Sequence, residues 1–122
     1  MIRTHLASHP SVTLTRILAQ STVSELDTAE RWYTALWERG PDARPMPGLL
    51  EWHMDETAGL QVWSEAARAG RSTVVIGTDD LDAVADRLAA AGVTHQGVQP
   101  GGSGRILQVA DPDGNRIVLT GS

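Results

Sequence analysis

The stretch ADPDGNRIVLTG, residues 110–121, combines a tight turn with a strand. Residues 111–114, Asp-Pro-Asp-Gly, predict a type I turn, because Asp accepts a local hydrogen bond, Pro fixes φ at the second position and Gly relaxes the exit. The residues after the turn alternate, so Ile117 and Leu119 are expected to face a core while Val118 faces the opposite way. The strand after the turn therefore has one face in the core and a second face, with Val118 on it, that is free to line a different part of the molecule.

Including this last strand, the predicted elements occur in the same order twice: a strand, a helix and three further strands, separated by turn and capping residues. The first half is expected to contain a strand at 12–20, a helix capped by Ser24 and ended by Gly40, a loop at 41–48 with one short edge strand, and strands at 48–54 and 59–65. The second half is expected to contain strands at 72–78, 93–98, 105–111 and 115–120 and a helix at 81–91 that ends at Gly92. The linker at 66–72 is short, with Gly70 as its flexible point.

The two halves are also similar in their letters. ELDTAERWY at 25–33 aligns with DLDAVADRL at 80–88. Shared capping rules explain such a weak similarity without a common origin, but the matching order of elements favours duplication. We therefore predict a single α+β domain over residues 1–122, made of two βαβββ modules at about 12–65 and 72–121. These modules are expected to form a curved mixed sheet around a cleft, with the helices on the outer face.

Composition excludes several classes of function. With 122 residues, of which 41% are hydrophobic and 20% charged, the sequence suits one soluble domain with a core. The net charge of −5 argues against a nucleic-acid partner, and no apolar run is long enough for a membrane span. The first residues lack a secretory signal, so a cytoplasmic location is expected. All ten basic residues are arginine, and the absence of lysine and cysteine excludes Schiff-base lysines, thiolate nucleophiles, disulfides and cysteine-bound zinc.

The paired modules, the helix start VSELDTAERWY at 23–33 and the turn DPDGN at 111–115 together resemble the vicinal oxygen chelate superfamily. This family contains glyoxalase I, bleomycin-resistance binding proteins, fosfomycin-resistance enzymes and extradiol dioxygenases, and the resemblance covers roughly residues 12–121. In its metalloenzymes the first and last strands of each module send one His, Gln or Glu ligand each toward a divalent metal in the cleft. The resemblance carries these four positions to Leu18, Gln61, Thr73 and Val118.

Three of these positions are poor metal ligands. Leu18 and Val118 have no donor atom, and the neutral hydroxyl of Thr73 is a weak one. Shifting the first strand by two residues brings in Gln20, but no shift in the last strand supplies a carboxylate. The sequence therefore predicts no metal and no other cofactor, and it counts against glyoxalase I and dioxygenase activity.

Strand alternation indicates which side chains share the face of these four positions. The residues expected to bind a ligand in the cleft are Gln20, His53, Gln61, Trp63, Gln108 and Arg116. An aromatic ring among amides, an acid and a histidine is typical of a pocket for a drug-sized organic molecule. The alternative is that these are edge polar residues and that Trp63 is a packing residue.

His53 and Glu51 share one strand face, so an acid–base pair for catalysis is a second interpretation. An ordinary surface histidine is the alternative. His5, His9 and His95 receive no role, and the segment PGGSG at 100–104 is expected to be a loop at the rim of the cleft, because no helix follows it.

Three functions remain open. The first is a metal-independent binding protein that sequesters or carries a small organic molecule. The second is a metal-free isomerase, cyclase or lyase using His53 and Glu51, and the third is a structural or protein-interaction domain. The resemblance also offers a metal-dependent glyoxalase or dioxygenase, against which the four positions count. It further implies a homodimer with C2 symmetry, with contacts from the first helix or the ARPMPG segment at 43–48.

Overall fold

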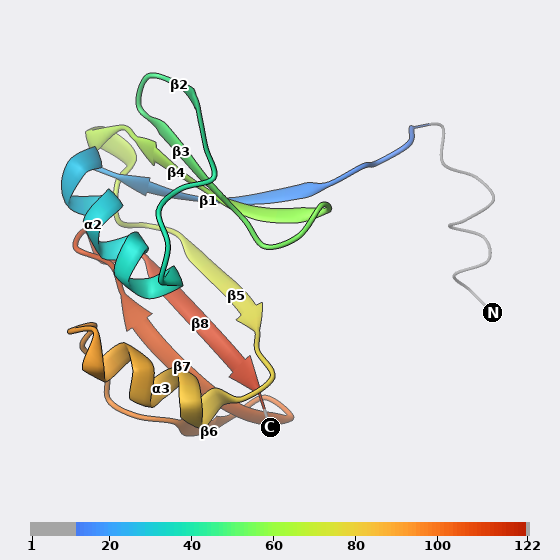
Figure 1. Cartoon of the computed structure of the whole chain (residues 1–122), viewed down its shortest axis with the longest axis vertical. Coiled ribbons are helices and arrows are strands. Elements are labelled where there is room, and N and C mark those ends of the chain that lie inside the picture. Colours follow the sequence, from blue (N-terminus) through green and yellow to red (C-terminus); the bar gives the residue numbers. More distant parts are fainter. Residues whose placement is uncertain (1–11, 122) are drawn as a thin grey trace.

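The computed structural model describes residues 12–121, and these form the predicted α+β fold of two βαβββ modules (Figure 1). Module one contains β1 (Ile17–Val23), α2 (Leu26–Trp37), β2 (Ala43–Met46), β3 (Leu49–His53) and β4 (Ala58–Ser64). A short 3-10 turn, η1 (Ala66–Arg68), leads into module two, which contains β5 (Thr73–Gly77), α3 (Leu81–Ala90), β6 (Gln99–Gly101), β7 (Gly104–Ala110) and β8 (Arg116–Gly121). His5 and His9 lie outside the described residues. Within residues 12–121, neither helix has the length and apolar character needed to cross a membrane.

Each module builds its own mixed four-stranded sheet, in the order β1-β4-β3-β2 in module one and β5-β8-β7-β6 in module two. The first and last strands of each module pair in parallel, and all other neighbours are antiparallel. Parallel pairing needs a long crossover, which the helix and the intervening strands of each module supply. The α2 helix contacts β4, and α3 contacts β7 and β8, so each helix covers one face of its own sheet (Figure 1). We call the other face of each sheet its uncovered face.

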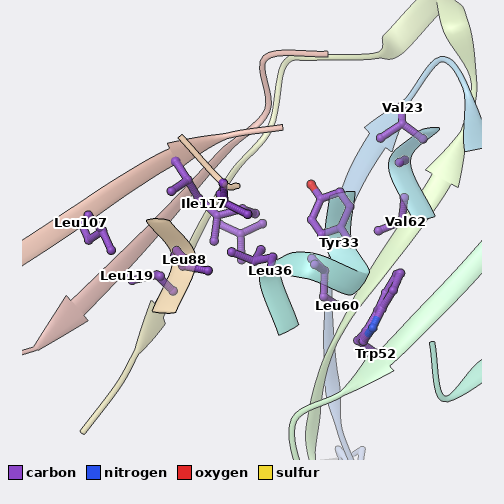
Figure 2. Packing of buried hydrophobic residues seen from close by; sticks show 14 of the residues in the cluster. Val23, Tyr33, Leu36, Trp52, Leu60, Val62, Leu88, Leu107, Ile117 and Leu119 are labelled. Carbon is purple, nitrogen blue, oxygen red and sulfur yellow. The ribbon is translucent and has the colours of Figure 1, made fainter. Parts of the chain in front are cut away.

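One hydrophobic core joins the two modules. Figure 2 shows Leu36 of α2 between Tyr33 and Leu60 of module one and Leu88 and Ile117 of module two. These side chains are at most 1% exposed. Because full burial of a Leu or Ile side chain typically contributes about 1.5–3 kcal/mol, the shared core holds the modules together as one body.

Module one differs from the expectation at three boundaries. The β1 strand runs from Ile17 to Val23 rather than over 12–20, because its partner β4 begins only at Ala58. Ser24 is not the cap of α2: Glu25 holds that position, and Ser24 donates to Asp113 instead.

The α2 helix also ends early. Its last residue is Trp37, and Glu38 turns into the left-handed region with φ of 61°, before the expected stop at Gly40. Arg87 of α3 donates to the Leu36 carbonyl at 3.0 Å and pairs with Glu38 at 3.1 Å. A cation at the last carbonyls satisfies the helix end, so module two supplies the stop that the local sequence does not.

In module two, the strand expected at 93–98 is absent, and the edge strand is β6, which includes the first residues of PGGSG. His95 accounts for the irregular path. Its Nδ1 accepts from the Gly97 N–H at 3.0 Å and its Nε2 donates to the Ala85 carbonyl at 2.8 Å, a tautomer assigned from these partners. These bonds hold the segment against α3 instead of in the sheet.

Candidate functional site

The turn at 111–115 is a buried polar joint. Asp111 is 4% exposed, and its carboxylate accepts from the Tyr33 hydroxyl at 2.7 Å and from the Asn115 backbone N–H and side-chain amide at 2.9 and 2.8 Å. Burial, with the negative charge of Asp111 beside it, raises the pKa of the Tyr33 phenol. The Tyr33 hydroxyl therefore stays protonated and donates its hydrogen bond. The Asp111 carboxylate thus links the 111–115 turn to α2.

The same turn ties the modules to each other. The Asn115 amide donates to the Thr22 carbonyl at 2.7 Å and accepts from the Ser72 N–H and hydroxyl at 2.9 and 2.8 Å. The Asp113 carboxylate accepts from the Ser24 N–H and hydroxyl at 3.0 and 2.6 Å. These bonds join the end of β1 to the starts of β5 and β8. The turn is therefore structural, which its sequence pattern alone does not reveal.

Four predicted site residues form one hydrogen-bonded chain on the uncovered face of module one. Gln20 Nε2 donates to Gln61 Oε1 at 2.9 Å, and Gln61 Nε2 donates to Glu51 Oε2 at 2.8 Å. The other carboxylate oxygen, Glu51 Oε1, lies 2.9 Å from His53 Nε2. The strand register produces the two contacts of Gln61, because Gln61 lies directly opposite Gln20 on β1 and opposite Glu51 on β3. We call these four residues the polar chain.

Glu51 lies at the centre of the polar chain and is 7% exposed. A buried carboxylate is stable only when it is paired or hydrogen-bonded. The hydrogen bond from His53, followed by that from Gln61, lowers the pKa of Glu51 below its ordinary value. At neutral pH the polar chain therefore contains an anionic carboxylate held in place by an imidazole and an amide.

This lowered pKa predicts a pH dependence of stability. A carboxyl whose pKa is lower in the folded state stabilises the fold above its unfolded pKa, and the contribution is lost as the pH falls through the folded pKa. Glu51→Gln removes the titrating group, so its free energy of unfolding should fall less steeply than that of the wild type between about pH 5 and about pH 3. Urea unfolding across this range measures the slopes. Glu56→Gln, at an exposed position in the β3–β4 turn, should keep the wild-type slope, and an equally steep loss in Glu51→Gln would contradict the assignment.

Trp63 lies on the same uncovered face, opposite Thr22 of β1 and Leu49 of β3. Its Nε1 donates to Glu65 at 3.0 Å, and a Cβ added to Gly48 would lie 3.3 Å from its ring. Packing therefore accounts for part of the ring, and the half-buried side chain leaves the rest accessible on this face.

The other two predicted residues, Gln108 and Arg116, lie in module two. Gln108 is opposite Val118, which is opposite Val75, and Val75 is 64% exposed on this uncovered face. A hollow of about 410 Å³ lies between Gln108, Arg116 and the segment 94–97. Within residues 12–121, no hydrogen bond or ion pair joins either residue to the polar chain. The structure thus brings four of the predicted residues together and leaves two apart.

The positions at which the resemblance places metal ligands do not fit a divalent metal. Leu18 packs against Gly59, where an added Cβ would lie 2.9 Å from its methyl group, and Val118 pairs with Val75. Only Gln61 offers an amide oxygen, and that oxygen already accepts from Gln20. The described part of the chain also has no group of three His, Asp or Glu side chains that could hold a metal ion. No catalytic step through a metal follows from this donor set.

A second hollow, of about 430 Å³, was missed by the sequence interpretation. It is lined by Gln20, Thr22, Arg68, Arg71 and Ser72. The linker packs closely at Gly70, because the Gly70 N–H donates to the Thr22 carbonyl at 3.1 Å and a Cβ there would collide with the Asp113 backbone oxygen. The available signal was the segment AARAGRS at 66–72, which carries two arginines and no acid.

Known proteins share this fold. Residues 19–119 match the family model of the Glyoxalase/Bleomycin resistance protein/Dioxygenase superfamily. A glyoxalase/bleomycin resistance protein from Catenulispora acidiphila DSM 44928 has a similar structure, with a TM-score of 0.82 and 24% identity over 88% of this chain and 98% of that one. The antibiotic binding protein TnmS3 from Streptomyces sp. CB03234 has a TM-score of 0.75 and 26% identity over 93% and 98%. The bleomycin-binding protein from Streptomyces verticillus, in complex with copper(II)-bleomycin, has a TM-score of 0.75 and 17% identity over 91% and 98%. No curated protein has a matching sequence.

Proposed function

Because the chain belongs to the glyoxalase/bleomycin resistance protein/dioxygenase superfamily, we propose that it is a metal-independent protein that binds a small organic molecule and sequesters or carries it. The polar chain carries this proposal, since it presents a connected hydrogen-bonding surface beside positions that lack metal-binding atoms. The likeness to TnmS3, an antibiotic binding protein at 26% identity, supports a ligand of the antibiotic kind.

The polar chain has unused hydrogen-bonding capacity at both ends. Among the described residues, Gln20 Oε1 accepts no hydrogen bond and His53 Nδ1 has no partner. Both oxygens of Glu51 are bonded within the chain, so Glu51 is a positioning residue that orients its neighbours. An aromatic surface at Trp63 beside polar groups fixed in this way suits an organic molecule with several polar substituents.

Titration with bleomycin, followed by tryptophan fluorescence, tests the proposal; the family description includes bleomycin resistance proteins. We expect saturable binding by the wild type. Gln61→Leu interrupts the polar chain, so Gln20 and Glu51 lose the bonds that orient them, and the affinity should fall about tenfold, which corresponds to about 1.4 kcal/mol. Arg31→Gln, at an exposed position of α2, should bind like the wild type. Equal affinities of Gln61→Leu and wild type would count against the polar chain as the site.

The 2.9 Å contact between His53 and Glu51 favours a second candidate, a metal-free isomerase, cyclase or lyase in which His53 acts as general acid or base. On a substrate of such an enzyme, His53→Ala should reduce turnover by roughly a hundredfold with little change in substrate binding. If His53→Ala binds the substrate more weakly but has a normal turnover rate, His53 contributes to ligand binding and not to catalysis.

We further propose that the protein is a cytoplasmic homodimer with C2 symmetry. The exposed side chain of Met46 (52%) would be covered in such a dimer, and a hollow of about 490 Å³ between Leu26 of α2 and residues 44–50 offers a contact surface. Light scattering at micromolar concentration should give twice the 13.1 kDa mass of one chain. A mass near that of one chain would contradict the dimer.

A further inference from the structure

Three arginines without an acidic partner lie at the joint between the modules. Four of the nine arginines in residues 12–121 form ion pairs with carboxylates, namely Arg39, Arg44, Arg87 and Arg105. Arg68, Arg71 and Arg116 form none within the described residues. The Arg116 N–H donates to the Ser72 carbonyl at 3.0 Å, so the start of β8 lies beside the residue that follows Arg71. The guanidinium groups at this joint are therefore not paired with carboxylates.

Arg68 and Arg71 line the second hollow together with Gln20, Thr22 and Ser72, and none of these five residues is acidic. The neighbouring carboxylates are occupied elsewhere. Asp111 is bonded to Tyr33 and Asn115, and Asp113 is bonded to Ser24. The acids of the joint are therefore committed to holding the modules together, and the two guanidinium groups keep their full capacity for an external anion.

The backbone that carries these arginines is fixed. The Arg68 N–H donates to the Glu65 carbonyl at 3.0 Å, the Gly70 N–H to the Thr22 carbonyl at 3.1 Å, and the Ser72 N–H to Asn115 at 2.9 Å. Both arginines thus start from backbone anchored to β1 and to the 111–115 turn. Such preorganisation reduces the entropy lost when a ligand is bound.

We propose that this second hollow is an anion-binding site, in which Arg68 and Arg71 hold an oxyanion group of the ligand, a carboxylate or a phosphate. Planar guanidinium groups bind both kinds of oxyanion through paired hydrogen bonds. The Thr22 hydroxyl, which has no partner among the described residues, adds a donor. Gln20 lines the hollow and also belongs to the polar chain, so the anion lies at the edge of the proposed ligand site. The identity of the ligand rests on the proposed function, whereas the anion site rests on its own residues.

The test uses inorganic phosphate and acetate as probes, with chloride as the control at constant ionic strength. Arginine Nε–Hε signals and backbone amides are followed by NMR during the titrations. We expect saturable shifts at Arg68, Arg71 and Thr22 with phosphate, acetate or both, and none with chloride. Arg71→Gln should weaken the binding of the effective probe at least tenfold, whereas Arg31→Gln, which removes the same charge from an α2 arginine without an ion pair, should leave it unchanged.

The response of each probe identifies the oxyanion: phosphate alone indicates a phosphate-bearing ligand, and acetate alone indicates a carboxylate. Shifts that do not saturate, equal shifts with chloride, or equal effects of Arg71→Gln and Arg31→Gln would overturn the anion site. Bleomycin titration separates this inference from the proposed function. If the protein binds bleomycin but neither phosphate nor acetate, only the anion site is contradicted. If it binds phosphate or acetate but not bleomycin, the anion site is supported and the proposed function is contradicted.

Discussion

Asp111→Ala is expected to lower the free energy of unfolding by about 3–5 kcal/mol, the usual effect of breaking a buried charged network by removing one partner. The Asp111 carboxylate is 4% exposed and accepts from the Tyr33 hydroxyl, from both donors of Asn115 and from the Asp113 N–H. The variant leaves these donors buried without an acceptor, and each unsatisfied group costs about 1–3 kcal/mol. Because Asn115 also holds Thr22 and Ser72, the two modules should loosen together.

Two further variants separate the network from a general effect of losing an aspartate. Tyr33→Phe removes one donor and should lose about 1–2 kcal/mol. Asp82→Ala removes an exposed ion pair with Arg105 and should leave the unfolding transition in urea nearly unchanged. A loss below about 1 kcal/mol for Asp111→Ala would show that the 111–115 turn does not hold the modules together.

Gly70→Ala is the second large effect, with an expected loss of about 3 kcal/mol or more in the free energy of unfolding. Gly70 has φ of 85°, and an added Cβ would collide with the Asp113 backbone oxygen. The conformation alone costs about 1–2 kcal/mol for a residue with a side chain, and the contact forces backbone at the module joint to move.

Gly92→Ala is the matched control, because Gly92 has φ of 82° with nothing within 4 Å of an added Cβ. It should lose only the conformational cost of about 1–2 kcal/mol. The difference between the two variants, measured by urea unfolding, isolates the contact with Asp113. Equal losses would mean that the joint can shift to accept the methyl group.

The fold could be predicted because its signals are local. Alternation placed Ile117 and Leu119 in the core, and both are at most 2% exposed. The expected helix at 81–91 matches α3 at its first residue and exceeds its last, Ala90, by one residue. Boundaries set by distant partners could not be read in this way. The stop of α2 depends on Arg87 from the other module, and His95 draws its segment out of the sheet through bonds to Ala85 and Gly97.

The candidate site was predictable in part for the same reason. Period-two alternation put Gln61, Glu51 and His53 on one face, and the structure links them by hydrogen bonds. Counting along the sequence placed Leu18 at the ligand position of the first strand, but the β1–β4 register sets Gln20 opposite Gln61. Alternation within one strand does not determine which residues of two neighbouring strands pair. It also cannot predict that Arg68 and Arg71 lie beside β1, because they come together only when the two modules pack in the folded chain.

Calorimetric titration of EDTA-treated protein with metal-free bleomycin tests the central claim most directly. This claim is that the uncovered face of module one binds an organic ligand without a metal. The account predicts saturable binding in EDTA, and no stoichiometric retention of Ni²⁺, Zn²⁺ or Mn²⁺ when each metal is added to the protein without bleomycin and the metal content is measured after desalting, because Leu18, Thr73 and Val118 leave no ligand set for these ions. Stoichiometric metal retention by the protein, or no saturable bleomycin binding in EDTA, would contradict it.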